Sequence, residues 1–139
     1  FFQVEPTLGV TLVLFVAMPF FLSVSDLAFR WQQSNIVLKQ GDALSKARRF
    51  DEALLMFNDA RDMDPSNGEI YFSLGMLYQG LSDTQPEKRE PNLNQAVDYF
   101  LKSLHYYELP MARLNLGAAY FQKGEIYLQQ SRYNPADKA

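Results

Sequence analysis

The chain has 139 residues, 11 of them Phe and 8 Tyr, and a formal net charge of −3 at pH 7. This length and aromatic content are enough for one ordinary hydrophobic core, which excludes a disordered tail. The 13 Lys and Arg residues are mixed with 16 Asp and Glu rather than clustered, so we expect no nucleic acid partner. The chain has no cysteine, which excludes disulfides, zinc–thiolate sites and thiol catalysis.

The first feature along the chain is a run of 20 residues without a charge, residues 6–25, with the sequence PTLGVTLVLFVAMPFFLSVS. At a rise of about 1.5 Å per residue, a helix of this length spans about 30 Å, the hydrocarbon thickness of a bilayer. The following Phe29, Arg30 and Trp31 have the aromatic and cationic character of a lipid headgroup boundary. The pattern predicts a single-pass transmembrane helix with its interfacial flank, residues 1–31. It would contact lipid through residues 6–29 and bend at Pro19. The residues chosen to represent the span are Leu8, Val13, Phe15, Pro19, Phe21 and Trp31.

Two other interpretations of this run are less suitable. A signal peptide needs a basic start, and no Lys or Arg precedes Arg30. A core helix in a small domain would have a polar face, and this run has only Thr and Ser. After the run, Arg30, Lys39, Lys46, Arg48 and Arg49 follow within about 20 residues, which favours the cytoplasmic side for the rest of the chain. The chain begins with Phe1 rather than Met. Basic residues or further membrane helices upstream of Phe1 would change this predicted orientation.

Beyond residue 31 the pattern becomes helical and repeats itself. The repeated element is a Gly with a large apolar residue three positions later, and it occurs as Gly41–Leu44, Gly75–Tyr78 and Gly117–Tyr120. The first two glycines are 34 residues apart. This period predicts a series of similar helical units.

Each of the first two units continues into a second helix with a second regular pattern. It has a small residue, then an aromatic four positions later, then another small residue three further on: Ala53, Phe57 and Ala60, then Ala96, Phe100 and Ser103. These offsets place the three residues on one face of a helix. Two helices approach closely only where small residues face each other, so the pattern predicts antiparallel hairpins. Pro65 ends the first unit, and Ser66 and Asn67 precede the next helix as caps.

The chain from residue 34 onward resembles the tetratricopeptide repeat family. The positions that carry the resemblance in the first unit are Gly41, Leu44, Ala53, Phe57, Ala60 and Pro65. The resemblance implies an all-α fold, in which antiparallel helix hairpins form a right-handed superhelix of about two and a half repeats. The domain would cover residues 32–139. Its repeats would be 34–67, 68–109 and a partial third, 110–139.

Two departures from the family pattern stand out. Repeat two has an insertion, residues 81–94, whose centre holds Glu87, Lys88, Arg89 and Glu90; it is either a solvated loop or a docking feature. In repeat three the stretch KGEIYLQQSRY continues the first helix by more than two turns. We therefore expect no second helix there. An apolar face would stay exposed unless further chain or a partner covers it.

The resemblance implies that function lies in a groove lined by the first helices of the repeats. The residues predicted to line it are Leu38, Asp42, Phe72, Met76, Leu114 and Phe121. An apolar floor with Met suits an amphipathic helix or an extended segment. Leu38 and Asp42 stand where related proteins carry a clamp for a carboxylate terminus, so we do not expect that clamp. Alternatively, the apolar members pack against the helix that leads out of the membrane.

Catalysis has no support in the sequence. His105 is the single histidine, there is no Gly-rich phosphate loop or activated nucleophile, and we expect no cofactor, no metal and no enzyme activity. We expect a membrane-anchored protein–protein interaction or scaffold module, a subunit or assembly factor of a membrane complex. Two alternatives remain. One is the repeat tail of a larger polytopic membrane enzyme such as a glycan polymerase or transferase, and the other is a peptide receptor in protein transport or assembly.

Overall fold

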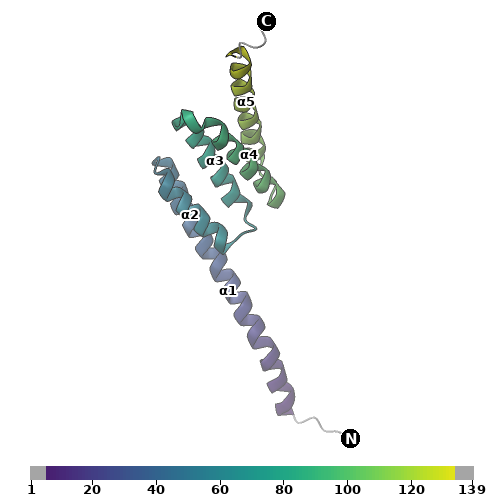
Figure 1. The fold of residues 1–139 in the computed structure, drawn as a ribbon. Helices are drawn as coiled ribbons and strands as arrows, with labels where there is room; N and C mark the ends of the chain where they lie inside the picture. Colours follow the sequence, from purple (N-terminus) through teal and green to yellow (C-terminus); the bar gives the residue numbers. More distant parts are fainter. Residues whose placement is uncertain (1–5, 134–139) are drawn as a thin grey trace.

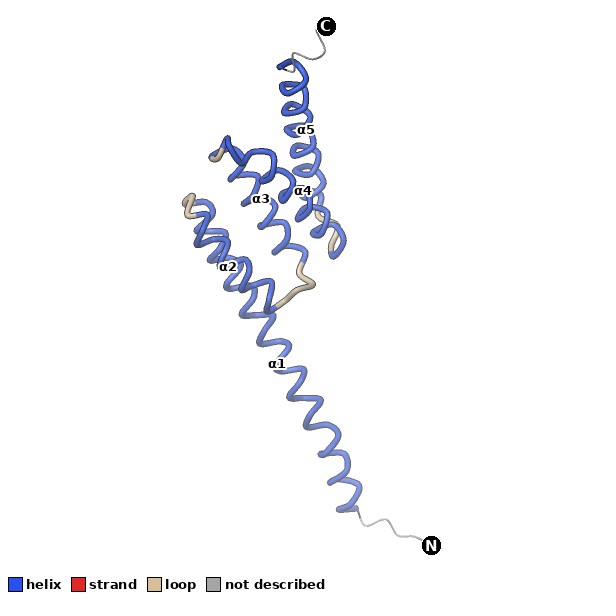
Figure 2. Tube along the Cα trace, in the orientation of Figure 1, coloured by secondary structure: helices blue, strands red, loops and turns tan. Residues whose placement is uncertain are grey.

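The computed structural model describes the backbone of residues 6–133 and the side chains of residues 17–132. The helices are α1 (Pro6–Lys46), α2 (Phe50–Met63), α3 (Gly68–Thr84), the 3-10 helix η1 (Pro86–Lys88), α4 (Arg89–Tyr106) and α5 (Pro110–Tyr133). The described residues contain no strand, as the all-α prediction requires. Figure 1 shows α1 and α2 as one hairpin and α3 and α4 as a second, with α5 beside α4. The loops between the helices are short (Figure 2).

Helix α1 is one continuous helix of 41 residues with Pro19 inside it. Its C-terminal part packs on α2, and its N-terminal part extends away from the other helices (Figure 1). The predicted boundary at residue 31 is therefore not a break in secondary structure. Nothing between residues 20 and 46 is a Pro or a Gly except Gly41, so no residue there interrupts the helix.

The described residues do not support the predicted transmembrane helix. Within them, no helix is both long enough and apolar enough to cross a membrane. Leu8, Val13 and Phe15 of the predicted span lie outside the residues whose side chains are described. Pro19, Phe21 and Trp31 are described, and all three are exposed.

A residue in the left-handed conformation makes the turn from α1 to α2. Arg48 has a φ of 59° and is the one described non-glycine residue with positive φ. Its N–H donates to the carbonyl of Ser45 at 3.0 Å, and the N–H of Arg49 donates to that of Leu44 at 3.0 Å. These two bonds form the standard C-terminal motif of a helix, in which Gly is the usual residue at the left-handed position. They satisfy the last carbonyls of α1 and reverse the chain.

Glycines set the close approach of the helices in both hairpins. A Cβ built on Gly41 would lie 2.5 Å from Cε1 of Phe57, and one built on Gly75 would lie 2.6 Å from Cδ1 of Phe100. Both rings are fully buried. Each ring thus lies against the bare backbone of the partner helix, which explains why Gly and an aromatic recur together in the sequence.

Contacts between repeats continue from this core. Ile70, Leu74 and Leu77 of α3 are buried in one cluster with Phe57 of α2. The buried hydroxyl of Ser34 donates to the carbonyl oxygen of Ala60 at 3.0 Å, which fixes α1 against α2. The first hairpin and α3 therefore share one core.

The loop between the hairpins follows the predicted capping only in part. Asn67 is the N-cap of α3, and its side chain accepts from the N–H of Glu69 at 3.0 Å. Ser66 is not a helix cap: its hydroxyl donates to Oδ1 of Asp64 at 3.1 Å. The loop is thus stabilised by one helix cap and one local side-chain bond.

The insertion, residues 81–94, is largely helical. It adds a turn to the end of α3, then η1, then the first turn of α4. It also contacts α5, which runs to Tyr133 as the sequence predicts. A nitrogen of Arg89 lies 3.9 Å from a carboxylate oxygen of Glu125, and Nε2 of Gln130 donates to Glu90 at 3.4 Å. The lengthened second hairpin is thus matched by a lengthened α5.

The glycine contacts make a stability prediction. Gly75→Ala should destabilise the fold by about 1–3 kcal/mol, because a methyl group would overlap the Phe100 ring. At Gly80 the nearest atoms to a built Cβ are 3.5 Å away, on Phe50. Gly80→Ala should therefore be neutral or stabilise by up to about 1 kcal/mol, the usual gain from replacing Gly inside a helix. Chemical denaturation of the two variants measures both effects, and equal stability of the two would contradict the proposed packing.

Candidate functional site

The predicted groove residues lie on the first helix of each repeat, and the structure joins two of these helices through a polar contact. The hydroxyl of Ser73 on α3 donates to Oδ1 of Asp42 on α1 at 2.8 Å. Both residues are half-buried. Asp42 therefore lies between the repeats and fixes their relative position, in addition to facing the predicted groove.

Leu38 does not lie on an open surface. Its side chain is only 5 % exposed and packs in the core with Phe57 and Leu74. A side chain buried this deeply cannot contact a partner while the core is intact, so Leu38 is removed from the candidate groove. The sequence did not reveal this because helical spacing defines a face but not how closely the next helix covers it.

The two groove residues of α3 differ from each other. Phe72 is half-buried, and its ring lies 6.0 Å from that of Phe100 in a tilted arrangement. Met76, one turn further, is 42 % exposed. Phe72 thus contributes to the second hairpin's core, while Met76 is available to a partner.

The two groove residues of α5 are the most open of the set. Leu114 is 66 % and Phe121 69 % exposed. They line a shallow cleft of about 610 Å³ together with Gly117 and Ala118. No described helix packs on this side of α5, so apolar surface faces solvent here.

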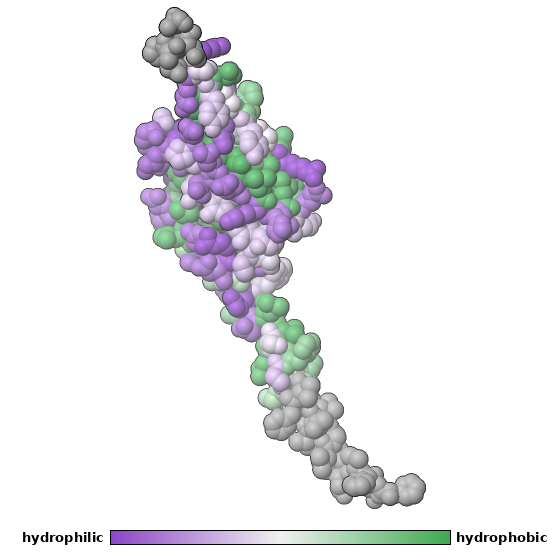
Figure 3. All heavy atoms as spheres, turned by 45° about the vertical axis from the view of Figure 1, so that its right-hand side comes forward, coloured by the Kyte–Doolittle hydropathy of each residue, from purple (hydrophilic) through white to green (hydrophobic). Residues whose placement is uncertain are grey.

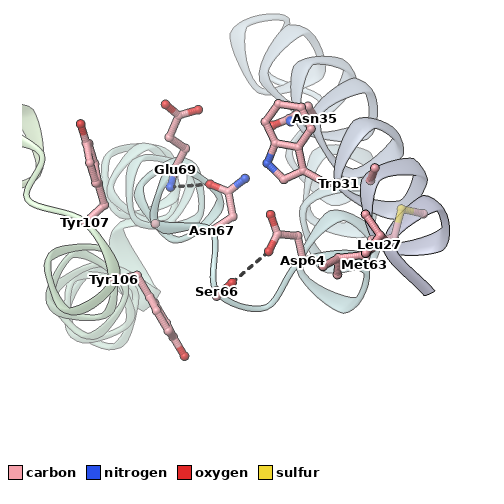
Figure 4. Close-up of a pocket in the computed structure, with 13 residues that line it drawn as sticks. Leu27, Trp31, Asn35, Met63, Asp64, Ser66, Asn67, Glu69, Tyr106 and Tyr107 are labelled. Atoms are coloured by element: carbon pink, nitrogen blue, oxygen red, sulfur yellow. Dashed lines mark hydrogen bonds between the residues drawn. The ribbon is translucent and has the colours of Figure 1, made fainter. Parts of the chain in front are cut away.

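A second cleft, of about 790 Å³, lies where α1 leaves the repeats (Figure 4). Leu27 and Trp31 of α1 form one side, and Tyr106 and Tyr107 at the end of α4 form the other. The residues of the α2–α3 loop lie between them. Sequence reasoning assigned Trp31 to a membrane boundary and missed this cleft, because only the folded chain brings α1 and the end of α4 to the same region.

Tyrosines beside this cleft form a stacked group. Tyr71 stacks on Tyr106 with ring centroids 5.4 Å apart, and Tyr78 stacks on Tyr99 at 5.5 Å. The Tyr71 hydroxyl donates to the carbonyl of Pro65 at 2.8 Å. Burial is the main cause that raises the pKa of Tyr71 and of Tyr78 above the ordinary tyrosine value. Tyr71 and Tyr78 therefore remain neutral through the physiological range.

The chemistry of these surfaces is that of packing and hydrogen bonding. Among the described residues, no group of three or more His, Cys, Asp or Glu side chains could hold a metal ion. His105 is exposed and lies edge-on against the ring of Tyr106.

The Asp42–Ser73 contact makes a second stability prediction. Ser73→Ala should cost about 1 kcal/mol, because it leaves a half-buried carboxylate without this donor. Asp42→Ala alone should cost a similar amount, and adding it to Ser73→Ala should cost little more, since both changes remove the same interaction. Asp98→Ala, on the exposed side of α4, is the control. Urea denaturation of the four variants measures the coupling, and fully additive losses would show that the two side chains act independently.

Comparison with known proteins identifies one family. Residues 38–81, 44 of the 139, match the model of the tetratricopeptide repeat. The match covers the end of α1, the whole of α2 and most of α3. No curated protein and no solved structure matches the chain. Members of this family are typically non-catalytic, and the repeat at residues 38–81 suggests a protein–protein interaction module.

Proposed function

We propose that this chain is an interaction module held at a membrane by the N-terminal part of α1, and that it binds a partner protein of a membrane complex through the groove face of α3 and α5. The observation that carries the membrane part is the surface of residues 17–31, here called the apolar stalk. Its exposed large apolar side chains are Met18, Phe20, Phe21, Leu22, Val24, Leu27, Phe29 and Trp31.

The apolar stalk has no protein cover in the described part of the chain. On the side seen in Figure 3, the stalk is mainly hydrophobic and lies below the repeats, whose surface is largely hydrophilic. Burying one such side chain gains about 1.5–3 kcal/mol, so leaving them all in water is costly. A soluble amphipathic helix would bury its apolar face, whereas this one exposes eight large apolar side chains among the 15 residues 17–31.

The two serine hydroxyls of the stalk are satisfied within the helix itself, whereas Asp26 and Arg30 are charged and exposed. The hydroxyl of Ser23 donates to the carbonyl of Phe20 at 2.9 Å, and that of Ser25 donates to Phe21 at 2.8 Å. Internal satisfaction of this kind is what a lipid environment requires, because lipid offers no hydrogen-bond partners. Together with the uncharged residues 6–25, these bonds support insertion into a bilayer. Residues 17–31 alone are too short for a span, so the proposal includes residues 6–16 of α1.

The basic residues support one orientation. Arg30 and Lys39 are the first Lys or Arg of the chain, and three more follow up to Arg49. This bias favours the cytoplasmic side for the repeats. The side chain of Arg30 also donates to the backbone carbonyl of Asp62 at 3.3 Å. It links the base of the stalk to the end of α2.

The membrane proposal predicts vesicle binding that a single charge weakens. The full chain should float with phosphatidylcholine vesicles in a density gradient. Met18→Arg should reduce the bound fraction strongly, because a cation near the centre of a span costs about 2.5–3.5 kcal/mol. Gln40→Arg, on the exposed surface of α1 within the repeats, should float like the parent chain.

Two results would contradict this proposal. Full-length protein that stays in the aqueous fraction would show that the apolar stalk is covered by protein instead of lipid. The orientation has a separate readout, since the chain has no cysteine. A cysteine placed at Ser66 should be protected from a membrane-impermeant maleimide in intact cells and labelled after lysis. Labelling in intact cells would reverse the orientation.

The interaction proposal predicts that exposed groove residues are needed for partner retention. Met76→Glu and Phe121→Glu should each lower co-purification of the partner from native membranes in mild detergent by at least about tenfold, since a charge would be buried in an apolar contact. Leu55→Glu, on the exposed side of α2, is the matched control. Quantitative mass spectrometry measures retention. Circular dichroism should show unchanged helix content, and full retention by both groove variants would exclude the groove as the site.

A further inference from the structure

The cleft of about 790 Å³ where α1 leaves the repeats changes in chemical character along its length. Its wall on α1 is formed by Val24, Leu27, Ala28, Trp31 and Asn35. These positions recur at helical spacing and therefore form one stripe on α1. With a rise of about 1.5 Å per residue, the stripe is about 16 Å long. It runs from the apolar stalk, through Trp31, to the half-buried amide of Asn35, so the cleft is apolar at its stalk end and polar at its repeat end.

The repeat end of the cleft is acidic. Asp64 and Glu69 line it, and the 13 described residues that line the cleft include no Lys, Arg or His. Asp64 accepts a hydrogen bond from the hydroxyl of Ser66 at 3.1 Å. In the described part of the chain, neither carboxylate has an ion-pair partner. Figure 4 shows Glu69 and Trp31 on opposite sides of the cleft. Two carboxylates without a counter-ion, beside an aromatic side chain, favour a cationic group as the ligand.

An exposed arginine lies beside this acidic end. A nitrogen of Arg30 donates to the backbone carbonyl of Asp62 at 3.3 Å. Asp62 directly precedes Met63, which lines the cleft. A guanidinium has five N–H donors, so others of Arg30 are available to an anion. The same region therefore offers acceptors for a cation and, next to them, donors for an anion.

We propose that this cleft binds the headgroup region of phosphatidylethanolamine. The ammonium group of the lipid donates to Asp64 and Glu69, and its phosphate accepts from Arg30. Its acyl chains begin along Val24 and Leu27 of the stalk. This inference rests on the membrane attachment proposed above, because an inserted stalk places the cleft at the level of the lipid headgroups. The apolar, anionic and cationic parts of the lipid then follow the same order as the apolar, basic and acidic parts of the cleft.

The lining favours an ethanolamine headgroup over two other cations. A choline group has the same charge but no N–H, so it cannot donate to the two carboxylates, whereas a primary ammonium donates up to three hydrogen bonds. A lysine of a partner protein would satisfy the carboxylates equally well. It would leave Arg30 without an anion and the apolar end of the cleft, at Val24 and Leu27, without cover. A lipid occupies all three parts of the cleft.

The cleft contains its own fluorescent probe, because Trp31 is the one tryptophan of the sequence. The full chain in mild detergent is titrated with dihexanoyl phosphatidylethanolamine, and the tryptophan emission is recorded. The emission should change to saturation. Dihexanoyl phosphatidylcholine should bind at least about tenfold more weakly, because hydrogen bonds to two charged groups are lost. Both lipids have the same acyl chains, so partition into the detergent micelle is matched.

Three variants assign the parts of the site. The double variant Asp64→Asn with Glu69→Gln should weaken binding of the ethanolamine lipid at least about tenfold and remove the preference over choline. Arg30→Gln should weaken binding of both lipids, since both carry the phosphate. Asp83→Asn is the control, because Asp83 is exposed at the other end of α3, and it should bind like the parent chain. Circular dichroism should show the same helix content for all four proteins.

Flotation separates this inference from membrane attachment itself. The double variant should float with phosphatidylcholine vesicles like the parent chain, because its stalk is unchanged. If the parent chain does not float, membrane attachment fails, whereas the titration in detergent still measures binding at the cleft.

Two outcomes would overturn the proposal. Equal affinity for the two lipids, or unchanged affinity in the double variant, would show that the carboxylates do not bind the headgroup. Titration with butylammonium tests the other source of a primary amine. If it binds as tightly as the ethanolamine lipid, and both bind independently of Arg30, the cleft is a site for a lysine of a partner protein instead of a lipid.

Discussion

The structure depends on one repeated constraint, the contact of an aromatic ring with the backbone of a glycine on the facing helix. Phe57 packs against Gly41 and Phe100 against Gly75, so closely that neither glycine position has room for a Cβ. Because Gly has no Cβ, each ring can lie directly against the backbone of the facing helix, and this contact sets the separation of the two helices. This is why the rings are fully buried in a chain of only 139 residues. Each hairpin then presents a regular surface to the next. The Ser34–Ala60 bond holds α1 against α2 within the first hairpin, and the Ser73–Asp42 bond joins the first hairpin to the second.

The same constraint explains the asymmetry between the two faces of α5. Its inner face has Ala112 and Ala119, both fully buried, against α4. On its other faces, α5 has the residue types of a first helix. These include Gly117, against which no aromatic ring packs in the described structure. A helix with this composition is stable here because α4 and the insertion support its inner side, through contacts such as Arg89–Glu125. The groove face of α5 is therefore exposed because no described helix packs on it.

Much of the fold could be predicted from local patterns, because the relevant constraints are local. The Gly and aromatic spacings, the cap at Asn67 and the length of α5 all follow from residues close together in the sequence. The burial of Leu38 and the cleft at Trp31 did not, since both depend on how distant helices come together. The continuity of α1 was also missed. A change from apolar to mixed composition at residue 31 suggests two elements, but helix continuity is decided by the backbone, and nothing there breaks it.

That continuity has a mechanical consequence for the proposed function. If the apolar stalk and the first repeat were joined by a flexible linker, membrane attachment would leave the repeats free to rotate. One uninterrupted helix instead carries any orientation of the stalk directly into the repeat core, where Ser34, Leu38 and Gly41 pack on α2. The Arg30 bond to the end of α2 adds a second connection at the same level. The exposed groove residues of α3 and α5 are then held at a fixed height and angle relative to the stalk. A partner that shares the same membrane would meet them already oriented, which lowers the entropic cost of binding.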